Sequence, residues 1–346
     1  MIRQALQQVL DGRSLSAAEA EGVMHGIMGG KATPAQIAGF LIALRMKGET
    51  VDEITGCARA MRRVVTRVEP GSGDLIDTCG TGGDGAGTFN ISTTAAFVVA
   101  GAGLRVAKHG NRSVSSKSGS ADVLKALGVN LELTPGQVAT CIDQVGIGFL
   151  FAPRLHPAMK HAIGPRRELG VRTIFNVLGP LTNPAGAQTQ LLGVYNAALT
   201  EVLANVLKEL GSRAAYVVHG HGGLDELSTT GPNRVSHFGV GGSPDEVVTE
   251  TLDPTDLELT LASPENLKGG DPEDNAEITR AVLAGKADGP QRDIVLLNAG
   301  AALFVGGKTA TLAVGISRAA EAIDDGSALD RLDALIALSR QLAPAG

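Results

Sequence analysis

The residues from 77 to 93 are the first segment of this sequence whose types and spacing could do chemistry. Four glycines lie between Gly80 and Gly85, and hydroxyl and amide side chains follow. Because glycine reaches positive φ and has no side chain, successive N–H groups can turn toward one anion. A helix expected from about Ser92 would add its free N–H groups. The pattern is typical of phosphate or diphosphate binding. A glycine-rich structural turn explains the loop alone equally well, and neither a Walker loop nor a dinucleotide motif is present.

A second polar segment runs from Lys108 to Asp122. It combines lysines and an arginine with serine and asparagine side chains in a loop punctuated by glycine. The cations supply charge and the polar groups supply directional donors, which suits phosphate and ribose oxygens. Ser120 also fits the N-cap of a following helix. A solvated polar loop is the alternative, and the nearby glycine loop makes ligand binding the favoured interpretation.

Two adjacent carboxylates, Asp225 and Glu226, follow an apolar strand pattern and a glycine-rich turn. Mg²⁺ prefers oxygen ligands and keeps several waters, so two carboxylates and substrate oxygens suffice to bind it. Adjacent acidic residues are also common on protein surfaces, and by itself the pair favours that simpler interpretation.

A fourth segment holds His156, Met159 and the neighbours Arg166 and Arg167. Arginine can hold a planar carboxylate with two parallel hydrogen bonds. The residues alone leave open which arginine faces a pocket, and His156 could simply start a helix. Cys79 is interpreted as a small buried residue below the first loop, because no nucleophile–histidine arrangement is legible.

The elements around these segments change character near residue 70. Residues 1–66 predict helices only. Beyond them, short apolar runs alternate with glycine turns and helical patterns, which favours a mostly parallel sheet with ligands at the carboxyl ends of its strands. From about Asn275 the chain again predicts helices. Three capping boxes mark helix starts in the first part, namely Ser16 with Glu19, Thr33 with Gln36 and Thr50 with Glu53.

Composition limits the class of protein. The 346 residues predict two packed domains. A formal net charge of −6 argues against general nucleic-acid binding, which needs a basic face. No apolar run approaches the length of a membrane span. The N-terminus predicts an amphipathic helix rather than a signal peptide, and three cysteines that are far apart favour a reducing, cytoplasmic location.

Taken together, the motifs resemble those of the anthranilate phosphoribosyltransferases. The resemblance covers nearly the whole chain and shows no departure at these positions. It implies a small all-helical domain and a larger α/β domain with a mostly parallel central sheet, of the nucleoside phosphorylase/phosphoribosyltransferase type. We expect the helical domain at 1–68 plus about 173–188, and the α/β domain at 69–172 and 189–346. The motifs are 80–84, 90–93, 108–111, 115–122, 175–184, 223–226 and 298–303.

The resemblance also implies roles for individual residues. Lys108, His109 and Arg166 would act through electrostatics and positioning rather than as an acid or base. Mg²⁺, as two ions per active site, would be held by Ser92, Asp225 and Glu226. Anthranilate would contact Gly80, Asn111, Arg166, His156 and Met159, with Arg166 favoured over Arg167. Phosphoribosyl diphosphate would contact Gly80, Gly83, Asp84, Thr88, Asn90, Ile91, Ser92, Thr93, Lys108, His109, Gly110, Asn111, Arg112, Ser113, Val114, Ser115, Ser116 and Ser120.

The implied reaction transfers the phosphoribosyl group of 5-phospho-α-D-ribose 1-diphosphate to the amine of anthranilate, in tryptophan biosynthesis. The implied assembly is a homodimer joined through the helical domain, without nucleic acid or membrane partners. Two alternatives stay open at this point: a pyrimidine nucleoside phosphorylase of the same architecture, and a non-enzymatic nucleic-acid-binding relative.

Overall fold

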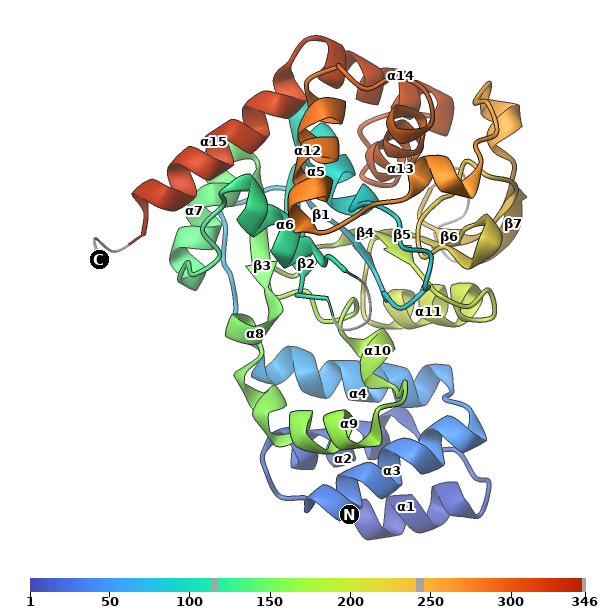
Figure 1. Cartoon of the computed structure of the whole chain (residues 1–346). Coiled ribbons are helices and arrows are strands. Elements are labelled where there is room, and N and C mark those ends of the chain that lie inside the picture. Colours follow the sequence, from blue (N-terminus) through green and yellow to red (C-terminus); the bar gives the residue numbers. More distant parts are fainter. Residues whose placement is uncertain (114–116, 241–245, 344–346) are drawn as a thin grey trace.

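The computed structural model describes residues 1–113, 117–240 and 246–343. Figure 1 shows two lobes, a small helical one that contains the N-terminus and a larger one built around a sheet. The helical lobe begins with four helices, α1 (Ile2–Leu10), α2 (Ala17–Met28), α3 (Pro34–Lys47) and α4 (Val51–Val64). All three predicted capping boxes are confirmed, at the starts of α2, α3 and α4.

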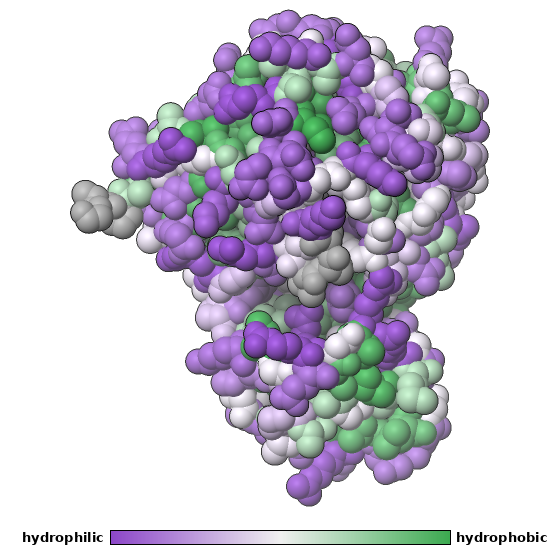
Figure 2. Space-filling model, in the orientation of Figure 1, coloured by the Kyte–Doolittle hydropathy of each residue, from purple (hydrophilic) through white to green (hydrophobic). Residues whose placement is uncertain are grey.

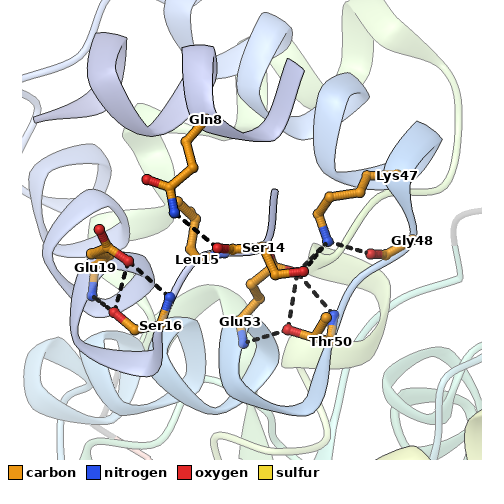
Figure 3. A network of polar contacts seen from close by, with 9 residues as sticks. All are labelled: Gln8, Ser14, Leu15, Ser16, Glu19, Lys47, Gly48, Thr50 and Glu53. Carbon is orange, nitrogen blue, oxygen red and sulfur yellow. Dashed lines mark hydrogen bonds and ion pairs between the residues drawn. The ribbon is translucent and has the colours of Figure 1, made fainter. Parts of the chain in front are cut away.

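One of these caps also holds the helical lobe together. Glu53 is fully buried at the start of α4, where its carboxylate accepts hydrogen bonds from the backbone N–H groups of Thr50 and Leu15. Lys47, at the end of α3, donates to the same carboxylate at 2.9 Å. Figure 3 shows how the group ties α3, α4 and the turn before α2 together. A buried carboxylate is tolerated here because its oxygens are paired.

A later part of the chain returns to the helical lobe. Its short elements are α8 (Ala152–Leu155), η1 (Pro157–His161), α9 (Ile163–Leu169) and α10 (Phe175–Leu178). Figure 1 shows α9 and α10 in green beside the blue N-terminal helices. Phe175 and Leu178 are buried in one apolar cluster with residues of α2, α3 and α4. Residues more than a hundred positions apart therefore share the core of this lobe.

The large lobe contains a seven-stranded sheet of order β3-β2-β1-β4-β5-β6-β7. The first five strands in this order are parallel, and β6 and β7 are antiparallel to their neighbours. The predicted mostly parallel sheet is thus confirmed. The strands are β1 (Leu75–Gly80), β2 (Arg105–Gly110), β3 (Ile147–Phe151), β4 (Thr189–Gly193), β5 (Ala214–His219), β6 (Asn233–Phe238) and β7 (Val248–Leu252).

Helices cover both faces of this sheet. Leu191 belongs to one core, with α5 and α13, whereas the next residue, Leu192, belongs to the other core, with α11 and the helical lobe. This alternation follows from the two-residue period of a strand. The helices are α5 (Ile91–Gly101), α6 (Ser120–Leu127), α7 (Pro135–Val145), α11 (Leu199–Glu209), α12 (Pro272–Leu283), α13 (Pro290–Val305), α14 (Leu312–Asp324) and α15 (Ser327–Gln341).

Two details differ from the sequence-based expectations. Ser120 is the first residue of α6, and Gly119 takes the N-cap position, so the prediction of Ser120 as N-cap is wrong. The Ser120 hydroxyl instead donates to the Asn111 carbonyl at 3.2 Å. The antiparallel strands β6 and β7 were not predicted. Within the described part of the chain, no helix combines the length and apolar character needed to cross a membrane.

Candidate active site at the carboxyl ends of the strands

The acidic pair lies against the ends of the central strands. After β5 the chain makes the short turn η2 (His221–Gly223) and then carries Asp225 and Glu226 back over the sheet. A Cβ atom at Gly193 would lie 1.6 Å from the Asp225 carbonyl oxygen, and one at Gly80 would lie 2.3 Å from its carboxylate. Only glycine fits at these two strand ends. The sequence thereby places both carboxylates beside the first glycine loop.

Hydrogen bonds join the acidic pair to two parts of the first predicted phosphate-binding segment, residues 77–93. The Gly82 N–H donates to the Asp225 carboxylate at 2.6 Å. The Ser92 N–H, in the first turn of α5, donates to the Glu226 carboxylate at 3.2 Å. Asp84 accepts from the Asp225 N–H at 3.5 Å and from the Ala86 N–H at 3.1 Å. Two regions more than 130 positions apart in the sequence therefore meet at one point.

The electrostatics of this point suit a divalent cation. Burial, followed by the charges of Glu226 and Asp84, raises the pKa of Asp225 well above its usual range. Burial raises the pKa of Glu226 to about 7, against the opposing charge of Lys108 and hydrogen bonds from Ser92. A nearby cation would stabilise the ionised form of these crowded carboxylates. Carboxylate oxygens are also ligands that Mg²⁺ prefers. The described residues contain no cluster of three or more His, Cys, Asp or Glu side chains suited to a metal.

The glycine loop has the backbone that an anion cradle requires. Gly82, Gly83, Gly85 and Gly87 all have positive φ, between 66° and 76°. The loop leads through Asn90, the N-cap of α5, to the first turn of that helix, where the Ile91 N–H donates to the Phe89 carbonyl and the Ser92 N–H donates to Glu226. Loop and helix start together present backbone donors next to the acidic pair. Of the other predicted residues here, Thr88 is half-buried, while Ile91 and Thr93 are buried and contribute backbone.

Lys108, at the end of β2, is buried and points toward the same place. Its ammonium group donates to the Thr78 carbonyl and, at 3.4 Å, to the Ser92 hydroxyl. Burial lowers its pKa, opposed by the charges of Asp77, Glu226 and Asp225. Lys108 therefore places a buried amino group next to the first turn of α5 and near the acidic pair.

The rest of the second polar segment is only partly enclosed. Asn111 and Arg112 are exposed, and Ser113 donates its N–H to Asp122 at 3.0 Å. Gly110 packs closely against Ser120 and Phe149. Three predicted site residues, Val114, Ser115 and Ser116, lie outside the described residues.

The predicted anthranilate residues lie where the two lobes meet. His109 and His156 are both buried, with 3.1 Å between their Nε2 atoms. His156 and Met159 line a small hollow together with Met28, Met61 and Val64 of the helical lobe. Sequence reasoning had brought His156 and Met159 near the site but had not paired the two histidines.

Arg166 and Arg167 differ in their surroundings. Arg166, on α9, lies half-buried with its guanidinium carbon 4.9 Å from the centre of the Phe175 ring. Arg167 is exposed. Enclosure against an aromatic ring holds a guanidinium in one orientation, which favours Arg166 as the group that could hold a substrate carboxylate.

Sequence reasoning missed several residues that shape the site. Arg172 donates to the Gly83 carbonyl and stacks on Tyr195, while its own carbonyl accepts from Arg45 of α3. It thereby links the helical lobe to the glycine loop. The available signal was its position three residues before Phe175, where the motif 175–184 begins. Asn90, a predicted site residue, is itself held by Asn275 of α12 at 3.0 Å.

Comparison with known proteins gives consistent matches. The sequence matches two family descriptions, "Glycosyl transferase family, helical bundle domain" over residues 3–64 and "Glycosyl transferase family, a/b domain" over residues 72–329. The first range covers the four N-terminal helices of the helical lobe, and the second covers the sheet together with the segment α8–α10 that returns to the helical lobe.

Curated relatives are similar over nearly their whole length. The anthranilate phosphoribosyltransferase of Acetivibrio thermocellus is 54% identical, with 97% of this chain and 96% of the relative covered. That of Moorella thermoacetica is 56% identical, with 97% and 98% covered.

Solved structures show the same architecture. The crystal structure of anthranilate phosphoribosyltransferase from Thermus thermophilus superimposes with a TM-score of 0.91 at 44% identity, covering 97% of this chain and 99% of that one. The Saccharomyces cerevisiae enzyme in complex with phosphoribosyl diphosphate and Mg superimposes with a TM-score of 0.88 at 29% identity, covering 98% of both chains. A structure of the same yeast enzyme holds 4-fluoroanthranilate, with a TM-score of 0.87.

Proposed function

The chain belongs to the anthranilate phosphoribosyltransferases, and from this premise we propose which of its residues carry the reaction. The reaction transfers the phosphoribosyl group of 5-phospho-α-D-ribose 1-diphosphate to the amine of anthranilate, giving N-(5-phosphoribosyl)anthranilate and diphosphate. The comparisons give no support to a nucleoside phosphorylase or a nucleic-acid-binding relative. The place of the reaction in tryptophan biosynthesis is part of the proposal.

Phosphoribosyl diphosphate is proposed to bind along the glycine loop and the start of α5. The observation that carries this assignment is the meeting of Gly82, Ser92 and the acidic pair through two hydrogen bonds. Backbone donors there can hold the diphosphate oxygens, and Lys108 adds positive charge from behind the helix. Asn111, Arg112, Ser113 and Ser120 border the same region and are proposed to hold the ribose phosphate.

Mg²⁺ is the proposed cofactor, held by Asp225, Glu226 and the Ser92 hydroxyl. Binding of Mg by the yeast relative supports the metal, and two ions per site is the number that we propose. When bound, the ions would offset the negative charge that develops on the leaving diphosphate. The role of this chain's residues is to orient the metal ligands through Gly82 and Ser92 and to keep them beside the anion loop.

Anthranilate is proposed to bind between the lobes with its carboxylate on Arg166. The aromatic amine is uncharged at neutral pH, so it can attack the anomeric carbon without a strong base. An oxocarbenium-like transition state would then need positioning and shielding from water more than acid–base help. Gly80, Asn111, His156 and Met159 are proposed to line this part of the site, and His109 lies against His156 there.

The assembly and location are proposed on separate grounds. Figure 2 shows hydrophobic surface on the helical lobe, where Met1, Leu10 and Met46 are among the exposed large apolar side chains. A homodimer joined through this lobe would cover such a surface.

Three free, buried cysteines fit a reducing cytoplasm. The domain bounds 1–68 with about 173–188 stay a prediction, which the burial of Phe175 against α4 supports.

The direct test follows anthranilate fluorescence in the presence of the purified chain. Fluorescence should fall with time only when both phosphoribosyl diphosphate and Mg²⁺ are present, and chelation of Mg²⁺ should stop the decay. Decay that continued unchanged with excess chelator would overturn the metal assignment. Complete absence of decay under all conditions would overturn the activity.

A further inference from the structure

Asn298 is a buried polar residue that none of the roles above uses. It lies on α13 with no exposed surface. Its amide nitrogen donates to the Leu227 carbonyl at 2.8 Å and to the Ile294 carbonyl at 2.9 Å. Its amide oxygen accepts from the Leu227 N–H at 3.0 Å. The side chain thus binds both backbone groups of one residue, as a neighbouring strand would, and all its bonds are to backbone.

Leu227 is the residue directly after the acidic pair. On the opposite side, the backbone of the pair rests on glycines: a Cβ at Gly193 would lie 1.6 Å from the Asp225 carbonyl oxygen, and one at Gly220 would lie 2.3 Å from that of Glu226. The peptide that carries both carboxylates is therefore held between the strand ends and α13. Loss of the Asn298 side chain would remove the contact that holds this peptide on the side of α13.

Helix α13 is a firm support for such a contact. Gly300 on α13 and Gly315 on α14 let the two helices approach so closely that a Cβ at Gly315 would lie 2.4 Å from the Gly300 carbonyl oxygen. Helix α13 also packs against α5, which carries Ser92. Helix α13 therefore contacts both parts of the proposed metal site: it binds the residue after the two carboxylates through Asn298, and it packs against α5, which carries Ser92.

We propose that Asn298 is a positioning residue that holds Asp225 and Glu226 in the geometry a divalent cation needs. The proposal rests on the metal role of the acidic pair proposed above. Residues that orient metal ligands typically change metal affinity by about 10- to 100-fold when they are replaced. A purely structural role would lower stability without this selective effect on the metal.

Asn233, the first residue of β6, supplies a control that contacts the same loop. It is also buried and also binds both backbone groups of one residue: it accepts from the Ser228 N–H at 2.7 Å and donates to the Ser228 carbonyl at 3.0 Å. It donates to the Gly231 and Leu252 carbonyls as well, both at 3.2 Å. Asn233→Ala therefore removes at least as many backbone contacts as Asn298→Ala, but none to Leu227, the residue that follows the acidic pair, so only Asn298→Ala should disturb the carboxylates.

The experiment measures Mn²⁺ binding by water proton relaxation, with phosphoribosyl diphosphate present and anthranilate absent, so that turnover plays no part. We expect Asn298→Ala to weaken Mn²⁺ binding by about 10-fold or more, and Asn233→Ala to leave it unchanged at a similar loss of thermal stability. Equal weakening in both variants, or none in either, would overturn the proposal.

Two further variants keep the result interpretable. In Asn298→Ser, the hydroxyl can still bond to the Ile294 carbonyl one turn earlier but is too short for Leu227, so folding should be retained while Mn²⁺ binding weakens. Wild-type affinity in this variant would contradict the proposal even if Asn298→Ala failed to fold. Asp225→Asn with Glu226→Gln tests the premise separately: unchanged Mn²⁺ binding there would remove the proposed metal site itself.

Discussion

The Nε2 atoms of His109 and His156 lie 3.1 Å apart in the interior between the two lobes. Burial lowers the pKa of His109 to about 3, with a further contribution from His156. Burial lowers the pKa of His156 to about 4. Both rings are therefore neutral near pH 7 in the folded protein, and one of them donates the N–H that the other accepts. Protonation of both rings would leave no acceptor and would break the contact.

This pair predicts a loss of stability in acid. Both histidines are neutral above pH 6.5 in either state, but below it the unfolded chain binds protons that the folded chain does not. Stability should therefore fall as the pH drops from about 6.5 toward 4. At pH 5 each histidine would contribute about 2 kcal/mol to the loss. Urea unfolding at pH 7.5 and pH 5 should show a smaller difference for His156→Gln than for the wild type, whereas His221→Gln, at an exposed position, should keep the full difference.

For Asp225 and Glu226 we expect the opposite dependence of folding stability on pH. The folded-state pKa values of Asp225 and Glu226 are raised, so the folded protein loses stability as pH rises from about 4.5 through 7. Without divalent ions at pH 8, Asp225→Asn with Glu226→Gln should be more stable than the wild type by about 1–3 kcal/mol. The gain should shrink toward pH 4.5. If the double variant were less stable than the wild type at pH 8, burial of the two carboxylates and repulsion between them would not be the cause of their raised pKa values.

Arg166 and Arg167 allow a matched test of anthranilate binding. Arg166→Ala should raise the KM for anthranilate, because loss of a charge-assisted hydrogen bond costs about 2 kcal/mol, or roughly 30-fold. The exposed neighbour in Arg167→Ala should have little effect. Steady-state kinetics with each substrate varied in turn decides the matter. A change confined to the KM for phosphoribosyl diphosphate would show that Arg166 serves the other substrate.

Gly193 predicts a steric effect on the acidic pair. In Gly193→Ala the new methyl group would meet the Asp225 carbonyl, which must move. We expect a stability loss of about 1–3 kcal/mol together with a higher Mg²⁺ requirement. Gly136→Ala is the control, since nothing lies within 4 Å of a Cβ there. Thermal unfolding measures the stability loss, and Mg²⁺ titration of activity measures the Mg²⁺ requirement. A normal Mg²⁺ requirement in Gly193→Ala would show that the contact of Gly193 with Asp225 does not affect metal binding.

Arg172 predicts a link between the lobes and the glycine loop. Its guanidinium donates to the Gly83 carbonyl, and the guanidinium carbon lies 4.1 Å from the centre of the Tyr195 ring. Arg45 donates to the backbone carbonyl of Arg172, a bond that side-chain variants of Arg172 retain. Arg172→Ala should raise the KM for phosphoribosyl diphosphate, and Arg172→Lys should restore little, because a lysine lacks the planar group that stacks and donates together. Full rescue by lysine in steady-state kinetics would reduce the role of Arg172 to its charge.

Local patterns predicted the elements of the fold well. The capping boxes at Ser16, Thr33 and Thr50 are local signals, and each marks the start of a helix. The strands β6 and β7 were missed, because their residues show no clear alternation: β7 is mostly exposed. Ser120 was mistaken for an N-cap, because a serine and a preceding glycine fit that position equally well from sequence.

The site was predictable as a set of segments but not as an arrangement. The acidic pair, the glycine loop and Ser92 were each identified, and their meeting follows from parallel strands ending at one edge. The pairing of the two histidines, the role of Arg172 and the contact of Asn298 with Leu227 were not predicted, because each depends on residues 47 to 89 positions apart. No local pattern encodes such contacts.

The return of α9 and α10 to the helical lobe bears on how a nascent chain acquires its structure. On the ribosome the first four helices emerge early, yet the apolar faces that receive Phe175 and Leu178 stay uncovered until α10 has been made. By then β1, β2 and β3 have also been synthesised. The small lobe therefore completes its core only after three strands of the sheet have been made, and a truncated product ending before α10 would be a substrate for chaperones or proteases.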